Sequence, residues 1–161
     1  YPNQYVEFTS KTKAVKEAKK LAKDSKDDLA IVKAVYNYVV KNVKYDDEKA
    51  QNVQSGYLPS VDETLKTKKG ICFDYAALTT AMLRSCDIPC KLQIGYTGDI
   101  KHAWIDVYIR SKGWVTGAVS FNGDSWSLMD PTFDSSADSD DTEAIQDYIG
   151  NADNYTVQFT R

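Results

Sequence analysis

The stretch of residues 72–86 constrains the fold more than any other part of the chain. Its sequence is CFDYAALTTAMLRSC, which is almost wholly apolar or small, and Pro89 follows it as a helix terminator. A helix that is apolar on every side is usually buried on every side. The remaining elements therefore have to surround this helix, and we expect it at the centre of the fold.

Two amphipathic helices are predicted ahead of the buried one. Residues 10–24 place apolar side chains at helical spacing, and a second helix follows from about residue 28 to residue 43. Ser25 and Asp28 resemble a capping arrangement, in which side-chain oxygens accept the unpaired N–H groups of a helix start. The apolar positions are Ala14, Val15, Ala18, Leu21 and Ala22 in the first helix, and Leu29, Val32, Tyr36, Val39 and Val43 in the second.

Strand patterns follow the buried helix. Residues 90–97 and 102–110 alternate between two sets of side chains, as half-buried strands do. Asn122-Gly123 favours the primed turns of hairpins, so residues 114–130 are predicted to form a strand pair. The other segments read as a loop at 45–60, a helical turn at 61–67, an acidic loop at 134–141, a short helix at 142–150 and a last strand at 155–160.

This order of elements defines the fold class. Helices followed by antiparallel strands, rather than alternating strand and helix, indicate an α+β fold. We expect N-terminal helices and the buried central helix to pack on one antiparallel sheet. A length of 161 residues is enough for one domain with a sizeable core, so residues 1–161 are predicted to form a single domain.

Composition limits the partners. The net charge of −3 argues against nucleic acid, because phosphate binding needs a concentrated basic surface. No apolar run approaches the roughly 20 residues that span a bilayer. A single histidine and cysteines without CxxC spacing argue against a metal site, and we expect no cofactor. The acidic loop lacks the ordered spacing of a calcium loop and is interpreted as solvated. The oligomeric state is left open.

Cys72 is the first candidate for chemistry. It follows Gly70 at the start of the buried helix, where we expect the glycine to let the chain turn sharply. A thiol at a helix N-terminus faces unpaired N–H groups and the positive end of the helix dipole, and both favour the nucleophilic thiolate. The alternative is that Cys72 acts as a small buried apolar residue.

His102 and Asp130 supply the other two groups that a cysteine nucleophile needs. His102 begins the 102–110 strand and can act as the base, while Asp130 ends a neighbouring strand and can orient the imidazole. These three residues would form a catalytic triad from one helix start and two strands. A histidine that only satisfies its hydrogen bonds at a strand start is the alternative.

Four pieces of the chain resemble the transglutaminase-like superfamily, whose members are related to papain-type cysteine proteases. They are Gly-x-Cys-x-x-Tyr-Ala at 70–76, a helix that ends in Ile88-Pro89, His-Ala-Trp at 102–104 and Asp-Pro-Thr at 130–132. The resemblance covers a core of about residues 28–134. It implies a papain-like fold in which Cys72 is the nucleophile, His102 the base and acid, and Asp130 the orienting group.

The resemblance also implies a side chain upstream of the cysteine that stabilises the oxyanion together with a backbone N–H. Tyr57 and Gln54 are the candidates, although Tyr57 is equally interpreted as a partly buried loop aromatic. The passage between the histidine and aspartate strands is longer than usual for the family, and it is predicted to add a strand pair near the cleft rim. Trp104 and Trp126 are candidates for the substrate cleft, with packing as the alternative.

Cys86 and Cys90 lie at the far end of the buried helix. A disulfide between them would suit a secreted protein, and two small side chains that pack separately are the alternative, because so short a loop demands tight geometry. The chain starts with Tyr1 and shows no basic and apolar leader, so we expect a mature secreted or cell-surface protein whose leader has been removed.

The expected function is cysteine-dependent acyl transfer on protein or peptide amides through a thioester. With an amine as acceptor, the enzyme would crosslink; with water as acceptor, it would be a peptidase or amidase. These residues are common to both reactions, so the sequence leaves the acceptor open. The remaining alternatives are a binding module that keeps the fold and has lost catalysis, and a structural cell-surface domain.

Overall fold

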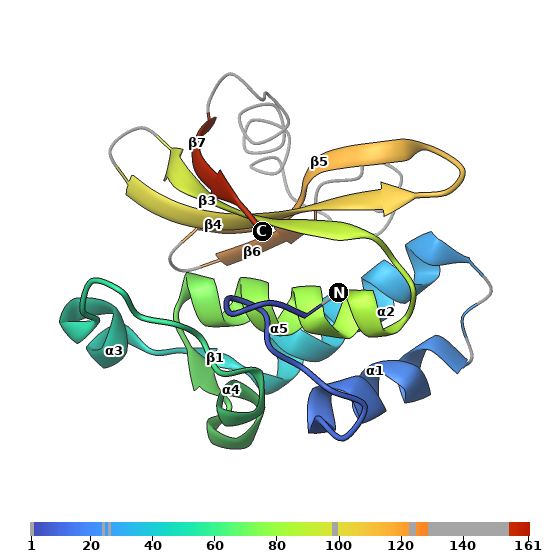
Figure 1. The fold of residues 1–161 in the computed structure, drawn as a ribbon, viewed down its shortest axis with the longest axis horizontal. Coiled ribbons are helices and arrows are strands. Elements are labelled where there is room, and N and C mark those ends of the chain that lie inside the picture. The colour runs from blue at the N-terminus through green and yellow to red at the C-terminus, as the bar shows by residue number, and fades with distance from the viewer. Residues whose placement is uncertain (1, 24, 26, 98–99, 123–124, 129–154) are drawn as a thin grey trace.

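Helix α5 (Cys72–Ser85) lies between a β-sheet and the other helices (Figure 1). In the computed structural model, its residues from Asp74 to Leu83 are all buried. On one side it packs against β3 (Cys90–Thr97) and β4 (Ile100–Ile109), and on the other against α1 (Lys13–Lys23), α2 (Asp28–Asn42) and α4 (Val61–Thr67). The prediction of a buried central helix in an α+β fold is confirmed. The structure describes residues 2–23, 25, 27–97, 100–122, 125–128 and 155–161.

The start of α2 differs from the sequence prediction. Asp27 is the N-cap, and its carboxylate accepts the Ala30 N–H at 2.8 Å. The Ser25 hydroxyl instead donates to the Leu21 carbonyl at the end of α1, at 3.2 Å. Asp27 caps the helix, and the Asp28 carboxylate pairs with Arg110 instead. The capping arrangement predicted for Ser25 and Asp28 is therefore wrong.

Three short elements break up the segment that precedes α5. Strand β1 (Lys44–Tyr45) pairs in parallel with β2 (Lys69–Gly70), and α3 (Asp47–Asn52) lies between β1 and α4. A strand of two residues is too short to show alternation, so the sequence pattern could not predict β1 and β2. The pair nevertheless matters, because it places α3 beside the start of α5.

Among the residues that the structure describes, the main sheet has five antiparallel strands in the order β6-β5-β4-β3-β7. Strand β5 (Gly113–Asn122) and strand β6 (Ser125–Leu128) form the predicted pair, with Asn122 opposite Ser125. Strand β7 (Tyr155–Thr160) pairs with β3 at the other side of the sheet. The predicted strands at residues 90–97 and 155–160 are confirmed, and β4 occupies the middle of the sheet.

Side chains on both faces of strands β3 and β4 are buried. Leu92 and Ile105 belong to the core that includes α5. At the alternate positions Gln93 and Asp106 are also buried, and the Gln93 amide donates to the Asp106 carboxylate at 2.8 Å. The sequence predicted half-buried strands, and this is wrong for these residues, because a polar pair satisfies its own hydrogen bonds and does not need water.

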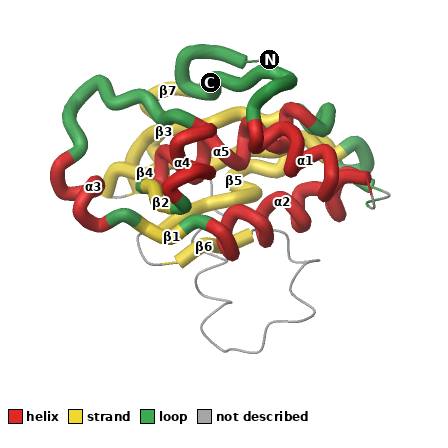
Figure 2. The backbone as a smooth tube through the Cα atoms, turned by 90° about the horizontal axis from the view of Figure 1, so that it is seen from below, coloured by secondary structure: helices red, strands yellow, loops and turns green. Residues whose placement is uncertain are grey.

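The two ends of the described chain lie close together (Figure 2). The Arg161 guanidinium carbon lies 4.9 Å from the centre of the Tyr5 ring, and Arg161 and Leu92 exchange backbone hydrogen bonds. Of the described helices, none combines the length and apolar character that crossing a membrane requires. The predicted helix at 142–150 and the acidic loop at 134–141 lie outside the described residues.

Candidate active site

Cys72 is the first residue of α5 and is partly exposed, whereas the residues from Asp74 to Leu83 are buried. The preceding residue, Ile71, is the N-cap and has extended backbone angles, with φ −94° and ψ 175°. The unpaired N–H groups and the dipole of a helix start stabilise an anion at this end. The structure therefore places Cys72 where the sequence predicted it, at the partly exposed start of an otherwise buried helix.

The other two cysteines occupy the far end of α5 and are thiols, not a disulfide. The Cys90 thiol lies 3.7 Å from the Thr80 carbonyl oxygen, to which it donates. Burial raises the pKa of the Cys90 thiol to about 11 and also raises the pKa of Cys86. The interpretation that these cysteines pack separately agrees with the structure. Neither thiol is in a setting that favours a nucleophile.

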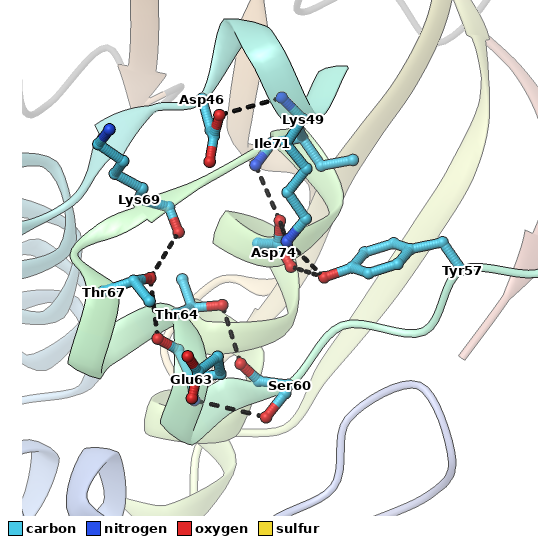
Figure 3. A network of polar contacts seen from close by, with 10 residues as sticks. All are labelled: Asp46, Lys49, Tyr57, Ser60, Glu63, Thr64, Thr67, Lys69, Ile71 and Asp74. Atoms are coloured by element: carbon cyan, nitrogen blue, oxygen red, sulfur yellow. Dashed lines mark hydrogen bonds and ion pairs between the residues drawn. The ribbon is translucent and has the colours of Figure 1, made fainter. Parts of the chain in front are cut away.

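A buried carboxylate organises the first turn of α5 (Figure 3). Asp74 is 0% exposed. Its Oδ2 accepts the Ile71 N–H at 2.9 Å and the Lys49 ammonium at 2.8 Å, and its Oδ1 accepts the Tyr57 hydroxyl at 2.5 Å. Lys49 also donates to the Tyr57 oxygen at 2.6 Å. We call Lys49, Tyr57 and Asp74 the Asp74 cluster.

The cap of α5 depends on Asp74 because Ile71 carries no polar side-chain atom. A carboxylate three residues after the N-cap can accept the N-cap N–H, as in one half of a capping box. Asp74 does this with the same oxygen that binds Lys49. One carboxylate therefore serves the helix start and a neighbouring cation together.

Lys49 and Tyr57 come from two adjoining segments that other contacts hold in place. The N-cap of α3, Asp46, accepts the Lys49 N–H at 3.0 Å, and the Asp46 N–H donates to the Gly70 carbonyl at 3.0 Å. Tyr57 lies in the loop of residues 53–60, where its N–H donates to the Gln54 carbonyl at 3.2 Å. Strand β2 thus fixes α3 at the same point of the chain that leads into α5.

Gly70 is required for a different reason from the one predicted. The sequence suggested a sharp turn, but the glycines with positive φ in the described chain are Gly56 and Gly113. A Cβ added at Gly70 would lie 2.6 Å from the Asp74 Cβ, closer than such atoms approach each other. The lack of a side chain at Gly70 therefore makes room for Asp74.

Tyr57 and Gln54, the two oxyanion candidates, occupy different surroundings. The Tyr57 hydroxyl is bonded within the Asp74 cluster, and its ring packs edge-on against Phe73 with centroids 6.3 Å apart. Gln54 is exposed and lines, with Val53 and Tyr57, a surface pocket of about 450 Å³. The tyrosine is tied to the start of α5, whereas the glutamine side chain faces the pocket beside it.

The remaining predicted site residues are placed to different degrees. His102 lies in β4, the strand beside β3, with its backbone opposite Gly95, and β4 packs on α5. Trp126 lies opposite Phe121 in the strand pair β5–β6. Asp130 lies outside the described residues. The contact between Cys72, His102 and Asp130 stays a prediction.

Trp104 is 1% exposed and ranks among the largest fully buried side chains. A groove-lining residue has to present its ring to a ligand, so the burial favours packing, the alternative interpretation of this tryptophan. Across the described ranges, no three His, Cys, Asp or Glu side chains gather where a metal ion could bind.

Sequence reasoning missed Lys49 and Asp74. A signal existed for Asp74, because a carboxylate in a helix predicted to be buried needs partners, and it stands three residues after the N-cap. No signal pointed to Lys49, which is one of many lysines on predicted surface segments. Its partner lies 25 residues away in the chain.

Cys72 thus stands at the start of a buried helix, and the one histidine lies in the central strand of the antiparallel sheet that packs on this helix. Residues 16–131 match the family model of the transglutaminase-like superfamily, and the chain belongs to this superfamily. The recognition made from the sequence motifs is confirmed.

Two curated relatives show how the chain compares with longer proteins. The UPF0252 protein MJ1282 of Methanocaldococcus jannaschii is 40% identical over 68 residues, which cover 39% of this chain and 19% of that protein. The kyphoscoliosis peptidase of Mus musculus is 27% identical over 127 residues, which cover 71% of this chain and 17% of that protein. The matches thus span less than a fifth of the length of either relative.

Two solved structures share the fold. A candidate cysteine protease from Cytophaga hutchinsonii superposes with a TM-score of 0.57 at 24% identity, over 76% of this chain and 39% of that one. A TGase superposes with a TM-score of 0.51 at 19% identity, over 70% of this chain and 30% of that one. At these identities the likeness establishes the transglutaminase-like fold.

Proposed function

We propose that the chain catalyses cysteine-dependent acyl transfer on protein or peptide amides through a thioester. The observation that carries the proposal is the position of Cys72 as the partly exposed first residue of a helix whose next turns are buried. A thiolate there is accessible from solvent and is stabilised by the helix start. Membership of the transglutaminase-like superfamily supports the same chemistry.

The proposed reaction has two halves. His102 takes the proton of the Cys72 thiol, the sulfur attacks the amide carbonyl carbon, and the resulting oxyanion is held by backbone N–H donors such as that of Cys72. The C–N bond then breaks as His102 returns the proton to the leaving amine, and a thioester remains. An acceptor attacks this thioester and frees the thiol. Asp130 orients the imidazole and stabilises its protonated form.

The acceptor is either an amine or water. Amine transfer would crosslink proteins, and hydrolysis would make the enzyme a peptidase or amidase. The names of the relatives include both, since one is a kyphoscoliosis peptidase and one solved neighbour is a TGase. The first half of the reaction is common to the two outcomes, so the test has to follow the fate of the acyl group.

The first test is thiol labelling. We expect Cys72 to react with iodoacetamide at about pH 6, well below the usual thiol pKa of about 8.5, while the other two cysteines stay slow. The raised pKa values of Cys86 and Cys90 supply the contrast within one protein. Peptide mass mapping identifies the labelled residue. Equally slow labelling of all three cysteines in the folded protein would contradict the proposal and favour a binding module.

The second test measures the reaction. The protein is incubated with glutamine-containing proteins and peptides, with and without a labelled primary amine. Amine incorporation that is lost in Cys72→Ala indicates transfer, and new peptide termini or ammonia without incorporation indicate hydrolysis. A reactive Cys72 with neither product would contradict amides as the substrate class.

We also propose a secreted or cell-surface location. The separate thiols of Cys86 and Cys90 do not support this location, because only a disulfide between them would indicate an oxidising compartment. Fractionation of cells that produce the natural full-length protein, followed by immunodetection in medium, surface and cytoplasmic fractions, tests it. Recovery in the cytoplasm alone would contradict it.

A further inference from the structure

The residues on both sides of Cys72 are held by the same group of side chains. Ile71 is fixed through its N–H, which Asp74 accepts at 2.9 Å. Phe73 is fixed through its ring, against which Tyr57 packs edge-on at an interplanar angle of 82°. The backbone that carries the thiol therefore lies between two anchored neighbours, and the Asp74 cluster contacts both of them. Tyr5, which is outside the cluster, also stacks on the Phe73 ring, with centroids 6.4 Å apart.

The charge of Asp74 makes its partners necessary. A fully buried carboxylate is costly unless it is paired and hydrogen-bonded. Lys49 provides the opposite charge at 2.8 Å, and its side chain is 31% exposed, so it links the buried carboxylate to the surface. Loss of Lys49 would leave a buried negative charge two residues from Cys72, where the chemistry needs another negative charge on sulfur.

The Tyr57 hydroxyl is already committed within the cluster. A tyrosine has one hydroxyl proton to donate, and here that proton goes to Asp74 Oδ1, while the oxygen accepts from Lys49. The same proton cannot also be donated to an oxyanion at the Cys72 site. Tyr57 would have to break its bond to the buried carboxylate before it could act as an oxyanion donor.

We propose that Lys49, Tyr57 and Asp74 are positioning residues for Cys72, and that Tyr57 acts through Asp74 and Phe73 rather than as the oxyanion donor. The cluster holds the backbone of residues 71–73 and fixes the loop of residues 53–60 against the start of α5. This inference rests on the proposed function of Cys72 as the nucleophile. It assigns to Tyr57 a role different from the one that the family resemblance implies.

Alkylation by iodoacetamide separates the two roles. The Cys72 sulfur displaces iodide from a CH₂ carbon, so an S–C bond forms, a C–I bond breaks and no tetrahedral oxyanion arises. A residue that only stabilises an oxyanion has no effect on this rate. A residue that positions the thiol affects alkylation and amide turnover alike, so alkylation detects positioning even before a natural substrate is known.

The variants are Tyr57→Phe, Lys49→Met and the double variant, compared with wild type at one neutral pH. We expect each single variant to slow Cys72 alkylation about tenfold. We expect the double variant to be hardly slower than either, because residues of one network do not act additively. Lys49→Arg keeps the charge and hydrogen-bond donors, and we expect it to slow alkylation less than Lys49→Met does. Circular dichroism and thermal unfolding monitor the fold of each variant.

The chain offers a matched control in Asp28→Asn. Asp28 is also a buried carboxylate in a first helical turn and is also paired with a cation, Arg110. It lies at the start of α2, and its partner follows the end of β4, away from the start of α5. We expect Asp28→Asn to lower the unfolding temperature and to leave the Cys72 alkylation rate unchanged.

Three results would overturn the proposal alone. The first is a wild-type alkylation rate in both Tyr57→Phe and Lys49→Met, and the second is an alkylation rate in Asp28→Asn that falls as much as theirs. Tyr57→Phe that turns over amides slowly but alkylates at the wild-type rate would also overturn it and assign Tyr57 as the oxyanion donor. An inert Cys72 in the wild type is a different outcome, because it contradicts the proposed function and this inference together.

Discussion

Two buried carboxylates, Asp28 and Asp74, occupy equivalent places in different helices. Each lies in the first turn of its helix, α2 or α5, and each binds one cationic side chain. Asp28 is 7% exposed and Asp74 is 0% exposed. Their burial and local position are therefore similar, and the difference between them lies in their partners.

Within the described part of the chain, Asp28 is bound by Arg110. The Arg110 guanidinium donates to both of its oxygens, and the Arg110 N–H donates to Oδ2 at 3.0 Å. The Arg110 side chain is 80% exposed. Asp74, by contrast, is bound by a backbone N–H, an ammonium and a hydroxyl from three different segments. One carboxylate joins two elements, and the other joins three parts of the chain around Cys72.

The comparison shows that the same interaction has different consequences in different surroundings. The Asp28–Arg110 pair closes the surface where α2 meets the end of β4, and its arginine can find water if the pair is lost. The Asp74 carboxylate is fully buried, so water cannot replace a partner that it loses. Loss of the Asp28–Arg110 pair should affect stability alone. Loss of the Asp74 cluster should affect both stability and the geometry of the proposed nucleophile.

The largest difference is expected for truncation of each carboxylate. Asp74→Ala removes the acceptor of three donors, and we expect it to lower the free energy of unfolding by about 3 kcal/mol. Asp28→Ala should cost clearly less, because Arg110 is solvated. Urea unfolding of both variants measures this. Equal losses would show that the number of partners does not distinguish the two regions.

Gly70→Ala tests how tightly the second region is packed. The new Cβ would lie 2.6 Å from the Asp74 Cβ, so α5 or β2 has to shift, and we expect a loss of about 2 kcal/mol. Gly56→Ala is the control, since its φ is +86° but nothing lies within 4 Å of the added Cβ. Its backbone strain alone should cost about 1 kcal/mol. A smaller loss at Gly70 than at Gly56 would show that the Asp74 region can relax.

Removing a buried polar group that makes no hydrogen bond should stabilise the protein, in contrast to removing Asp28 or Asp74. Within the described residues, the hydroxyls of Thr79 and Thr80 in α5 are buried and make no hydrogen bond. We expect Thr79→Val and Thr80→Val to raise the free energy of unfolding by up to about 1 kcal/mol. The matched control is Thr64→Val, because the buried Thr64 hydroxyl donates to the Ser60 carbonyl at 2.9 Å and its loss should destabilise. The same sign at both sites would contradict this reasoning.

The smallest effects on stability are expected from changes of pH. The Asp28 contribution should be lost in acid, and the Lys49 contribution should be lost in alkali. Hydrogen bonds from Arg110 lower the pKa of the Asp28 carboxyl. A carboxyl with a lowered folded-state pKa stabilises the protein above its unfolded pKa of about 3.9 and loses this as pH falls through the folded value. The stability difference between wild type and Asp28→Asn should therefore shrink in acid.

Lys49 has the opposite dependence. Burial lowers the pKa of its ammonium, but the bonds to Asp74 and Tyr57 outweigh burial and raise it. The Lys49 contribution to the free energy of unfolding is then present below the pKa of an unfolded lysine, about 10.4. It is lost as the pH rises through the pKa of Lys49 in the folded protein. The stability difference between wild type and Lys49→Met should shrink in alkali. Unfolding curves across the pH range test both regions, and a Lys49 contribution to the free energy of unfolding that stays constant or grows in alkali would contradict the assignment.

Elements whose side chains repeat over short distances could be predicted from the sequence. The apolar composition of residues 72–86 predicted the buried helix, and alternation predicted the strands at residues 90–97 and 155–160. Such patterns depend on neighbours within a few residues, so one sequence is enough to recognise them. The placing of Cys72 at the start of α5 follows from the same local reasoning, because a helix start is a local event.

The groups that meet at the start of α5 could not be predicted from the sequence, because they come together only in the folded chain. The partners of Asp74 lie 17 and 25 residues away in the chain, and Asp28 and Arg110 lie 82 residues apart. No periodicity encodes such pairs, since they depend on how the two-residue strands β1 and β2 place α3 beside α5. The reason for a glycine at position 70 also depends on the tertiary structure. A side chain at this position would collide with Asp74, and this collision arises only when the folded chain brings the two residues together.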